Sequence, residues 1–337
     1  TIKDVPGYAT LVQKNTLESL DDYITDAGIN LADFNGITDQ VTVDGSLYEL
    51  PFRSDYWLIY YNKDVFDAAG IAYPSNDMTM EDYDALARQL TDTTYGSQVY
   101  GCHYHTWRSA VELFGILDGK HSILDGNYDW MIPYYDMILS EEDDGVCQTY
   151  TDLSTEGLHY SAAFSNGNVA MMNMGSWFIS TLISNLDSGE YDSSLCGNWG
   201  IASYPHPDGA EAGSTIATIT GLAVTSASAN KDAAFDFVNW VSGTEGAKVM
   251  ASTGNFPAIM TDDVINTIAG MAGFPTDESS KEALNITNAY LEVPYAENVS
   301  EINSILDTYH TSIMNREVTV EEGVASMNEQ VGKILNQ

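Results

Sequence analysis

Basic residues are scarce in this chain of 337 residues, and acidic residues are abundant. Lysine and arginine together number 12, whereas aspartate and glutamate number 49, which gives a formal net charge of −37. Nucleic acids and anionic lipid surfaces are bound chiefly through lysine and arginine, so the composition excludes both as partners. Anionic small molecules are disfavoured for the same reason, which leaves neutral or cationic ligands.

Cysteines are few, and long apolar runs and catalytic motifs are missing. Cys102, Cys147 and Cys196 lie far apart and lack the spacing of a metal site. Both one disulfide with a free thiol and three buried thiols fit this number, and we favour buried thiols. No run approaches the roughly 18 apolar residues of a membrane-spanning helix. Without any G-x-S-x-G, H-E-x-x-H, Walker or G-x-G-x-x-G sequence, we expect no catalytic residue, metal or cofactor.

The remaining composition is that of a folded protein of mixed class. Hydrophobic residues make up 44% of the chain, which supplies a core despite the charge. The length favours two domains. Short predicted strands at residues 57–61, 169–172 and 213–225 alternate with predicted helices, so we expect an α/β fold.

Local signals predict several boundaries and faces. Thr79 and Thr319 each open a predicted helix with a capping pattern. Asp44 and Gly45 form the predicted turn of a hairpin within residues 41–50. The helix that begins near Asn230 is expected to bury Ala233, Phe237, Trp240 and Val241.

Two short segments combine polar and aromatic side chains. One contains Arg53, Ser54, Asp55 and Tyr56 beside a buried strand; the other, residues 102–108, contains Tyr104, His105 and Trp107. Sugar hydroxyls need polar partners, and the apolar face of a sugar packs on an aromatic ring. We therefore expect both segments to contact a ligand. The structural alternative for Asp55 is to cap backbone N–H groups.

Gly175, Ser176 and Trp177 lie between a predicted strand and a predicted helix. Glycine lets a ligand approach the backbone, and serine leaves the helix N-terminus accessible. This arrangement suits a ligand at the carboxyl edge of a sheet. The alternative, in which Trp177 is a core residue, is common for aromatic side chains.

Three stretches resemble motifs of the family 1 extracellular solute-binding proteins of ABC sugar importers, which include maltose-binding proteins. Each motif alone is modestly specific, but their order and spacing agree over essentially the whole chain. The matching residues are Leu50-Pro51, Tyr61-Asn62-Lys63-Asp64-Val65-Phe66, Ala69-Gly70 and Pro74; Asn166-Gly167-Asn168-Val169-Ala170-Met171 and Gly175-Ser176-Trp177; and Leu222-Ala223-Val224-Thr225, Ala229 to Phe237 and Gly254-Asn255-Phe256-Pro257-Ala258.

The resemblance implies a type II periplasmic-binding-protein fold, with two α/β lobes joined by crossing strands and a ligand in the cleft between them. The crossings would fall near residues 51–57 and 216–221. The N-lobe would comprise residues 1–54 and 220–260, and the C-lobe residues 55–219 and 261–337. Family members carry roughly sixty more residues before the point that matches Thr1, so we expect the N-lobe to be incomplete, with part of its sheet exposed.

The resemblance also suggests a binding site. Asp55 matches the position of a sugar-binding carboxylate, Trp177 matches a stacking aromatic, and residues 104–109 correspond to an aromatic contact segment. The expected ligand-binding residues are Asp55, Trp177, Arg53, Ser54, Tyr56, Tyr104, His105, Trp107, Gly175, Ser176 and Tyr8.

We therefore expect a non-catalytic, monomeric protein that captures a neutral oligosaccharide and delivers it to the permease subunits of an ABC transporter. The same resemblance implies an extracellular location and a lipoprotein anchor on a bacterial surface. One alternative keeps the fold and binds a polyamine or another cation, with affinity that falls as salt rises. Another is a glycoside hydrolase that uses two carboxylates and releases product.

Overall fold

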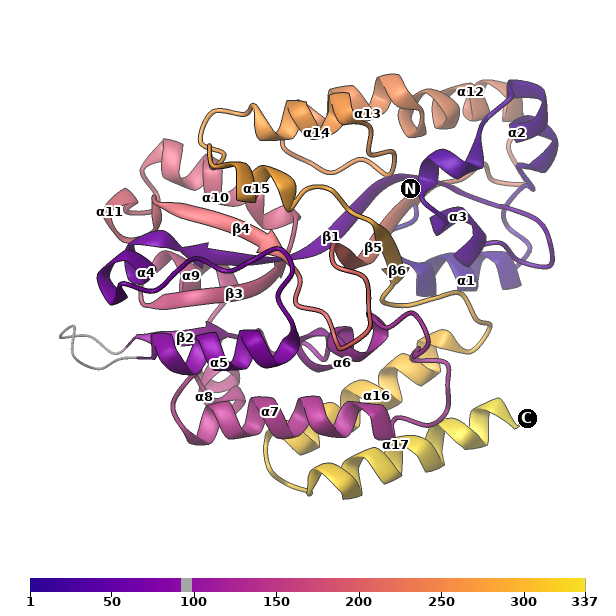
Figure 1. Ribbon diagram of the computed structural model, residues 1–337. Coiled ribbons are helices and arrows are strands. Elements are labelled where there is room, and N and C mark those ends of the chain that lie inside the picture. The colour runs from indigo at the N-terminus through magenta and orange to yellow at the C-terminus, as the bar shows by residue number, and fades with distance from the viewer. Residues whose placement is uncertain (92–98, 337) are drawn as a thin grey trace.

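A computed structural model describes residues 1–91 and 99–336. Helices surround a set of strands, and the longest strand, β1, pairs with three of the others (Figure 1). The strands are β1 (Leu50–Asn62), β2 (Tyr100–His103), β3 (Val169–Gly175), β4 (Trp199–Ser203), β5 (Ser214–Leu222) and β6 (Asn288–Leu291). The helices are α1 (Val5–Gln13), α2 (Asp21–Ala27), η1 (Leu31–Phe34), α3 (Ile37–Gln40), α4 (Lys63–Ala69), α5 (Met80–Leu90), α6 (Ser109–Ile116), η2 (Asp129–Met131), α7 (Ile132–Asp143), α8 (Tyr150–Glu156), α9 (Tyr160–Ser165), α10 (Trp177–Ser188), α11 (Ser193–Cys196), α12 (Lys231–Ser242), α13 (Thr244–Ala251), α14 (Asp262–Ala269), α15 (Glu278–Glu282), α16 (Val299–Met314) and α17 (Val320–Leu335).

Strand β1 changes its partners half-way along its length. Residues 50–56 pair antiparallel with β5, whereas residues 57–62 pair antiparallel with β3 and β4. Strand β2 joins β3 and strand β6 joins β5, both as parallel neighbours. One strand therefore belongs to two sets of partners, and the junction lies between Tyr56 and Trp57.

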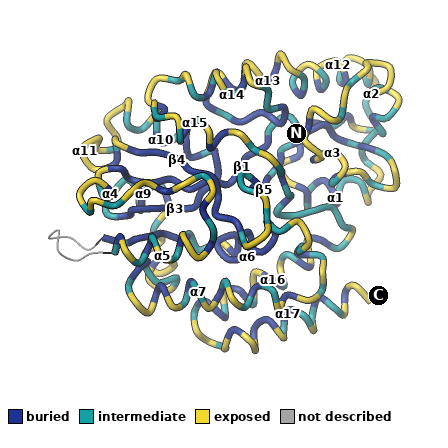
Figure 2. Tube along the Cα trace, in the orientation of Figure 1, coloured by how far each residue is buried: buried dark blue, intermediate teal, exposed yellow. Residues whose placement is uncertain are grey.

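The second half of β1 is buried on both faces, as its apolar sequence predicts. Residues 57–62 are all buried, and so is every residue of the neighbouring strand β3 (Figure 2). A strand without a solvent-facing side needs cover on both faces. The expected α/β class is confirmed by the helices that provide this cover (Figure 1).

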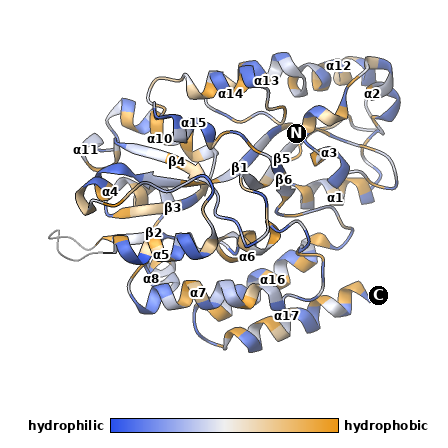
Figure 3. Cartoon of the chain, in the orientation of Figure 1, coloured by the Kyte–Doolittle hydropathy of each residue, from blue (hydrophilic) through white to orange (hydrophobic). Residues whose placement is uncertain are grey.

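Both predicted capping boxes are present. The Oγ1 of Thr79 accepts a hydrogen bond from the backbone N–H of Asp82 at 3.1 Å, and the carboxylate of Asp82 accepts one from the N–H of Thr79, also at 3.1 Å. Thr319 and Glu322 form the same pair at the start of α17. Helix α17 alternates hydrophobic and hydrophilic residues (Figure 3), and the apolar residues face the core. Within residues 1–91 and 99–336, no helix combines the length and apolar character that crossing a bilayer requires.

The predicted buried face of helix α12 is wrong. Phe237 is 61% exposed and Trp240 is 53% exposed, whereas the helix buries Phe235, Val238 and Ser242. The helix carries apolar side chains on two faces, and the face that contains Phe235 packs towards β1. Periodicity alone cannot identify the face that meets the sheet.

The hairpin predicted within residues 41–50 is only partly correct. Val43 and Ser46 exchange two backbone hydrogen bonds of 2.9 Å around Asp44 and Gly45. Both turn residues have positive φ, 50° and 83°, as a two-residue turn of this kind requires. The pairing stops at this single bridge and forms no regular strands.

The expectation of buried thiols is confirmed. Cys102, Cys147 and Cys196 are all buried free thiols.

Candidate functional site

Three tryptophan rings from separate parts of the chain meet beside the junction in β1. Trp57 lies on β1, Trp107 precedes α6, and Trp177 is the first residue of α10. Their ring centroids are 5.6 Å (Trp57–Trp177), 6.2 Å (Trp107–Trp177) and 6.4 Å (Trp57–Trp107) apart, distances typical of contacting aromatic rings. Trp57 is buried, but Trp107 is 40% exposed, so this tryptophan cluster has an open side.

The local sequence explains how Trp177 reaches the cluster. Gly175 ends β3 opposite Trp57, and helix α10 begins two residues later. A Cβ atom on Gly175 would lie 2.0 Å from the ring of Trp177, so the ring can fold back over the strand end only because Gly175 has no side chain. The indole Nε1 of Trp177 then donates a hydrogen bond to the hydroxyl of Tyr160 at 3.1 Å. Both contacts fix the orientation of the indole.

His105 extends the cluster on its polar side. Its ring centroid lies 4.6 Å from that of Trp107 and 5.4 Å from that of Tyr160. Burial and the neighbouring His159 lower the pKa of His105 to about 4, so the imidazole is neutral at pH 7. A neutral imidazole has one donor and one acceptor nitrogen, which suits a hydroxyl group.

A cavity of about 540 Å³ opens against the tryptophan cluster, and we call it the tryptophan pocket. Pockets for small molecules commonly measure about 300–1,000 Å³. Residues from the N-terminus, β1, α6, α10, α16 and the segment after β6 contribute to it. The lining residues are Lys3, Trp57, Thr106, Trp107, Arg108, Ser109, Glu112, Trp177, Glu292, Val293, Asn303, Asp307, His310 and Thr311.

A buried arginine organises the charges of the tryptophan pocket. The Nε of Arg108 lies 2.6 Å from Oε2 of Glu112, and its Nη1 lies 2.8 Å from Oδ1 of Asp307. Arg108 is 5% exposed and Glu112 is fully buried. Burial raises the pKa of Glu112, and the charge of Arg108 opposes this shift. One arginine is thus paired with two acidic side chains, so this part of the pocket keeps a negative excess, which the raised pKa of Glu112 reduces.

Glu292 is the acidic group of the pocket without an arginine partner. It follows strand β6, and its backbone N–H donates to the carbonyl of Ala217 on β5 at 3.1 Å. Burial raises the pKa of Glu292 to about 7, and the charge of Glu112 adds to the shift. The hydroxyl of Ser109 donates a hydrogen bond to the Glu292 carboxyl group. Near neutral pH this carboxyl group can therefore donate to or accept from a ligand hydroxyl.

The polar residues predicted at the β1 junction bind mainly to one another. Arg53 Nε lies 2.7 Å from Oδ2 of Asp55, and Ser176 Oγ donates to Oδ1 of Asp55 at 3.1 Å. Ser176 Oγ also accepts a hydrogen bond from the backbone N–H of Tyr56 at 3.2 Å. Burial raises the pKa of Asp55, and Arg53 opposes the shift. This network ties the junction of β1 to the start of α10 and does not line the tryptophan pocket.

Four other expected binding residues have buried side chains outside the tryptophan pocket. Tyr56 packs edge-on against Phe256, and Ser54 is fully buried beside it on β1. Tyr104 is 5% exposed and packs against core aromatics. Tyr8 is fully buried on α1, and its hydroxyl accepts a hydrogen bond from the N–H of Tyr48 at 3.3 Å. The structure thus brings Trp107 and Trp177 together in the pocket, with His105 alongside.

Several pocket residues were not singled out from the sequence. The sequence predicts Trp57 only as a buried strand residue. Its position directly after the polar segment at residues 53–56 is the signal that points to the pocket. Lys3 reaches the pocket because its neighbour Ile2 pairs with Gly221 on β5. No local sequence pattern predicts this contact, because the two residues are far apart in the chain. Glu292 had no signal that distinguished it among 49 acidic residues.

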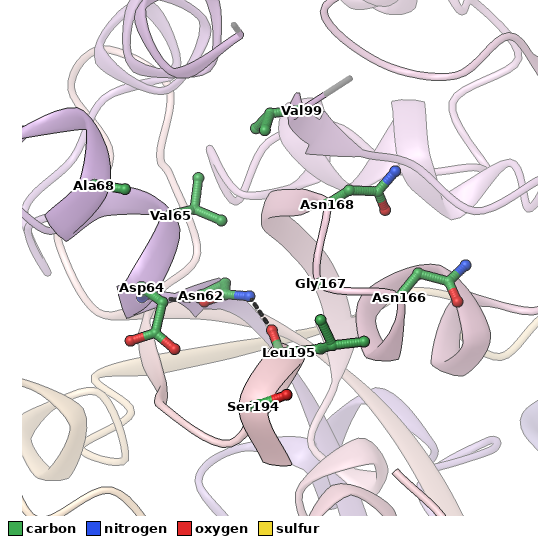
Figure 4. A pocket seen from close by; sticks show the side chains of 10 residues that line it. All are labelled: Asn62, Asp64, Val65, Ala68, Val99, Asn166, Gly167, Asn168, Ser194 and Leu195. Atoms are coloured by element: carbon green, nitrogen blue, oxygen red, sulfur yellow. Dashed lines mark hydrogen bonds between the residues drawn. The ribbon is translucent and has the colours of Figure 1, made fainter. Parts of the chain in front are cut away.

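A second hollow, of about 560 Å³, lies at the far end of β1 (Figure 4). Asn62 caps helix α4 there, and its Nδ2 donates to the carbonyl of Leu195 at 2.8 Å. Asn166, Gly167 and Asn168 form another side of the hollow. The described residues that line it include no aromatic ring, so it lacks the stacking surface of the tryptophan pocket.

Comparisons with known proteins agree on one family. The family model described as bacterial extracellular solute-binding protein matches residues 1–248. A sugar transporter from Rhizobium etli, solved in an open conformation, is 47% identical, with a TM-score of 0.93 over 98% of this chain and 84% of that one. A comparison with curated protein sequences gives no match.

More distant structures share the fold. The ABC substrate-binding protein from Listeria monocytogenes in complex with cycloalternan is 22% identical, with a TM-score of 0.78 over 98% of this chain and 82% of that one. A maltose-bound T. maritima protein is 17% identical, with a TM-score of 0.73 over 97% and 82%. The expected type II periplasmic-binding-protein fold is confirmed. The family match and the 47% identical relative show that this chain belongs to the bacterial extracellular solute-binding proteins.

Proposed function

We propose that this protein captures a neutral oligosaccharide in the tryptophan pocket and delivers it to the membrane subunits of an ABC transporter. The observation that carries the proposal is the tryptophan cluster beside a cavity of about 540 Å³. Aromatic rings offer the stacking surface that the C–H face of a sugar requires, and Glu292, which lines the same pocket, can bind hydroxyls.

We infer that the pocket lies between two lobes that close around the ligand. The N-lobe would comprise residues 1–54 and 220–260, and the C-lobe residues 55–219 and 261–337. The change of partners between Tyr56 and Trp57 supports a hinge near the end of the first N-lobe segment, because a strand shared by two sheets is a natural hinge. In this proposal Asp55, Arg53 and Ser176 hold the β1 junction, at the hinge, against the start of α10. Trp107 and Trp177 contact the sugar.

The charges of the pocket favour a neutral ligand over a polyamine. Although the chain has a net charge of −37, the pocket is lined by basic as well as acidic side chains. Lys3 and Arg108 face Glu112, Asp307 and Glu292. The single Arg108 is paired with both Glu112 and Asp307, Lys3 supplies a second positive charge, and the raised pKa of Glu292 reduces its negative charge. A polyamine site would need acidic groups that remain unpaired.

We further propose that the protein binds its ligand without chemical turnover. The family is one of solute-binding proteins, and one member of the Glu112–Glu292 pair is held by Arg108. A glycoside hydrolase needs one carboxylic acid and one free carboxylate beside the scissile bond. The release of shorter sugars during incubation with an oligosaccharide would contradict this part of the proposal.

Family membership also supports the partners and the location. We propose that the protein acts as a monomer on the bacterial surface, held there by a lipoprotein anchor, and that it docks onto the permease subunits of its transporter.

Calorimetry with a panel of neutral oligosaccharides tests the binding site. We expect Trp107→Ala and Trp177→Ala each to weaken binding at least tenfold, about 1.4 kcal/mol, because each removes a stacking surface. Trp240→Ala is the matched control, because Trp240 is 53% exposed on α12, outside the pocket, and should leave the affinity unchanged.

Two outcomes would overturn the proposal. If the folded protein binds no sugar of the panel, the ligand class is wrong. If Trp107→Ala and Trp177→Ala both retain full affinity for a bound sugar, the site is wrong. A separate titration at low and high salt distinguishes the cationic alternative, because the affinity for a neutral sugar should change little with salt.

A further inference from the structure

Two buried thiols and a buried carboxyl group meet away from the tryptophan pocket. Cys102 lies on β2, Glu141 near the end of α7, and Cys147 in the segment after α7. Their ligand atoms, two Sγ atoms and a carboxyl oxygen, all lie within 4.8 Å of one another. Cys102 and Glu141 are fully buried, and Cys147 is 3% exposed. We call these three residues the thiol cluster.

Backbone contacts hold the thiol cluster together. The N–H of Val146 donates to the carbonyl of Glu141 at 2.8 Å, which turns the chain back at the end of α7. The N–H of Cys102 donates to the carbonyl of the same Val146 at 3.4 Å, which fixes β2 against this turn. The side chains therefore converge because α7, the turn and β2 are connected through one residue.

The carboxyl group of Glu141 lacks the partners that a buried group needs. Neither Oε1 nor Oε2 has a hydrogen-bond partner among the described residues. Buried carboxyl groups are costly unless they are hydrogen-bonded, paired with a charge or bound to a metal. The hydroxyl of Tyr104 lies beside Cys102 and Glu141, but it too makes no hydrogen bond of normal geometry.

The neighbouring charged groups do not supply the missing partner. Asp84 and Arg88 face Glu141 from α5, and the carboxyl group of Asp84 is near enough to interact with that of Glu141 but forms no hydrogen bond of normal geometry with it. The guanidinium group of Arg88 is instead hydrogen-bonded to Asp84, Asp144 and Ser140. The carboxyl group of Glu141 and the thiols of Cys102 and Cys147 therefore remain as three possible metal ligands around one point.

We propose that Cys102, Cys147 and Glu141 bind one Zn²⁺ ion. Two sulfur donors and one carboxylate form a ligand set that zinc accepts, whereas Ca²⁺ and Mg²⁺ prefer oxygen donors only. Zinc binds sulfur at about 2.3 Å and oxygen at about 2.0–2.2 Å, so ligand atoms within 4.8 Å of one another can surround one ion. The Tyr104 hydroxyl or a water molecule completes the four-coordinate arrangement.

A disulfide between Cys102 and Cys147 is the competing use of the two thiols. It would explain the proximity of the sulfur atoms, but it would leave the carboxyl group of Glu141 without a partner. A metal ion uses all three residues at once. The thiol cluster shares no residue with the lining of the tryptophan pocket, so this inference does not depend on the sugar proposal.

Metal titration of the chelator-treated, reduced protein tests the proposal. We expect one equivalent of Zn²⁺ to bind and to raise the thermal midpoint, because the ion binds the folded chain. One equivalent of Co²⁺ should give thiolate-to-metal charge-transfer absorption. Cys147→Ser and Glu141→Gln should each weaken binding at least tenfold. Cys196→Ser is the matched control, because Cys196 is equally buried but lies outside the thiol cluster, on α11.

Wild-type protein provides a readout that does not depend on how the variants fold. Bound Zn²⁺ should slow the reaction of two of the three cysteines with a thiol reagent. The proposal is wrong if the reduced protein binds no Zn²⁺ or Co²⁺. It is also wrong if the protein, isolated without reductant, contains a Cys102–Cys147 disulfide and the reduced form gives no thiolate-to-cobalt absorption.

Discussion

Replacing Gly175 with alanine tests whether the absence of one Cβ atom holds the ring of Trp177 in the tryptophan cluster. The added Cβ would lie 2.0 Å from Cζ3 and 2.2 Å from Cη2 of Trp177. Carbon atoms in favourable contact are about 3.5–4.0 Å apart, so the ring must move by about 1.5 Å or more. This movement would also break the 3.1 Å hydrogen bond from Trp177 to Tyr160.

The expected cost follows from these two losses. Crowding of a packed site costs about 1–3 kcal/mol, and loss of a hydrogen bond about 1 kcal/mol. Because Trp177 is partly exposed and can swing outward, we expect the free energy of unfolding in Gly175→Ala to fall by about 2 kcal/mol. Guanidinium denaturation measures this change. Sugar affinity, measured by calorimetry, should fall about tenfold or more, because the stacking surface is displaced.

A control and a double variant make the result specific. A Cβ atom on Gly332, in helix α17, would meet nothing within 4 Å, so Gly332→Ala should be neutral or stabilising by up to about 1 kcal/mol. In a Trp177→Ala background the obstructing ring is gone, and Gly175→Ala should cost almost nothing. An equal cost of Gly175→Ala in both backgrounds would show that the added Cβ atom does not act through the ring of Trp177.

Three further predictions concern stability. Burial raises the pKa of Glu49 from 4.5 to about 8. The folded chain therefore binds this proton more tightly than the unfolded chain does. The resulting stabilisation of the folded state is full below pH 4.5 and is lost as the pH rises to 8. The free energy of unfolding, measured by chemical denaturation, should fall by up to about 1.4 kcal/mol per pH unit between pH 5 and 8. This dependence on pH should be weaker in Glu49→Gln. It should be unchanged in the exposed control Glu321→Gln. Arg108→Ala should destabilise the protein by about 3–5 kcal/mol, since it leaves Glu112 buried and unpaired. Adding Glu112→Gln to this variant should restore part of the stability, and no recovery would show that the unpaired Glu112 is not the cause of the loss. Thr319→Ala should cost about 1 kcal/mol in thermal unfolding through the lost N-cap of α17, and an unchanged midpoint would show that the cap contributes nothing.

The features that the sequence predicted well depend on near neighbours in the chain. The capping boxes at Thr79 and Thr319 join residues three positions apart, and the turn at Asp44 and Gly45 needs only positive φ angles. The apolar strand at residues 57–61 likewise identifies itself by composition. The buried face of α12 was mispredicted because the choice between two apolar faces is made by β1, a distant segment.

The candidate site was only partly accessible to the same reasoning. The sequence indicates Trp107 and Trp177 as ligand contacts, because polar or glycine neighbours accompany the aromatic rings in their segments. Trp57 looked like core, and it is buried, yet one edge of it borders the pocket. Glu292 and Lys3 reach the pocket through strand pairings far from their own sequence neighbourhoods, so only the folded chain reveals them.

The shared strand β1 also constrains the order in which the protein can fold. Residues 50–56 have their antiparallel partners in β5 (Ser214–Leu222), and residues 57–62 have theirs in β3 and β4. A nascent chain must therefore extend past Leu222 before β1 can be fully paired. Pairings between distant segments slow folding, because a long loop must close before any contact forms. Until then the apolar strand lacks its partners, and the high negative charge of the chain opposes association between incomplete copies.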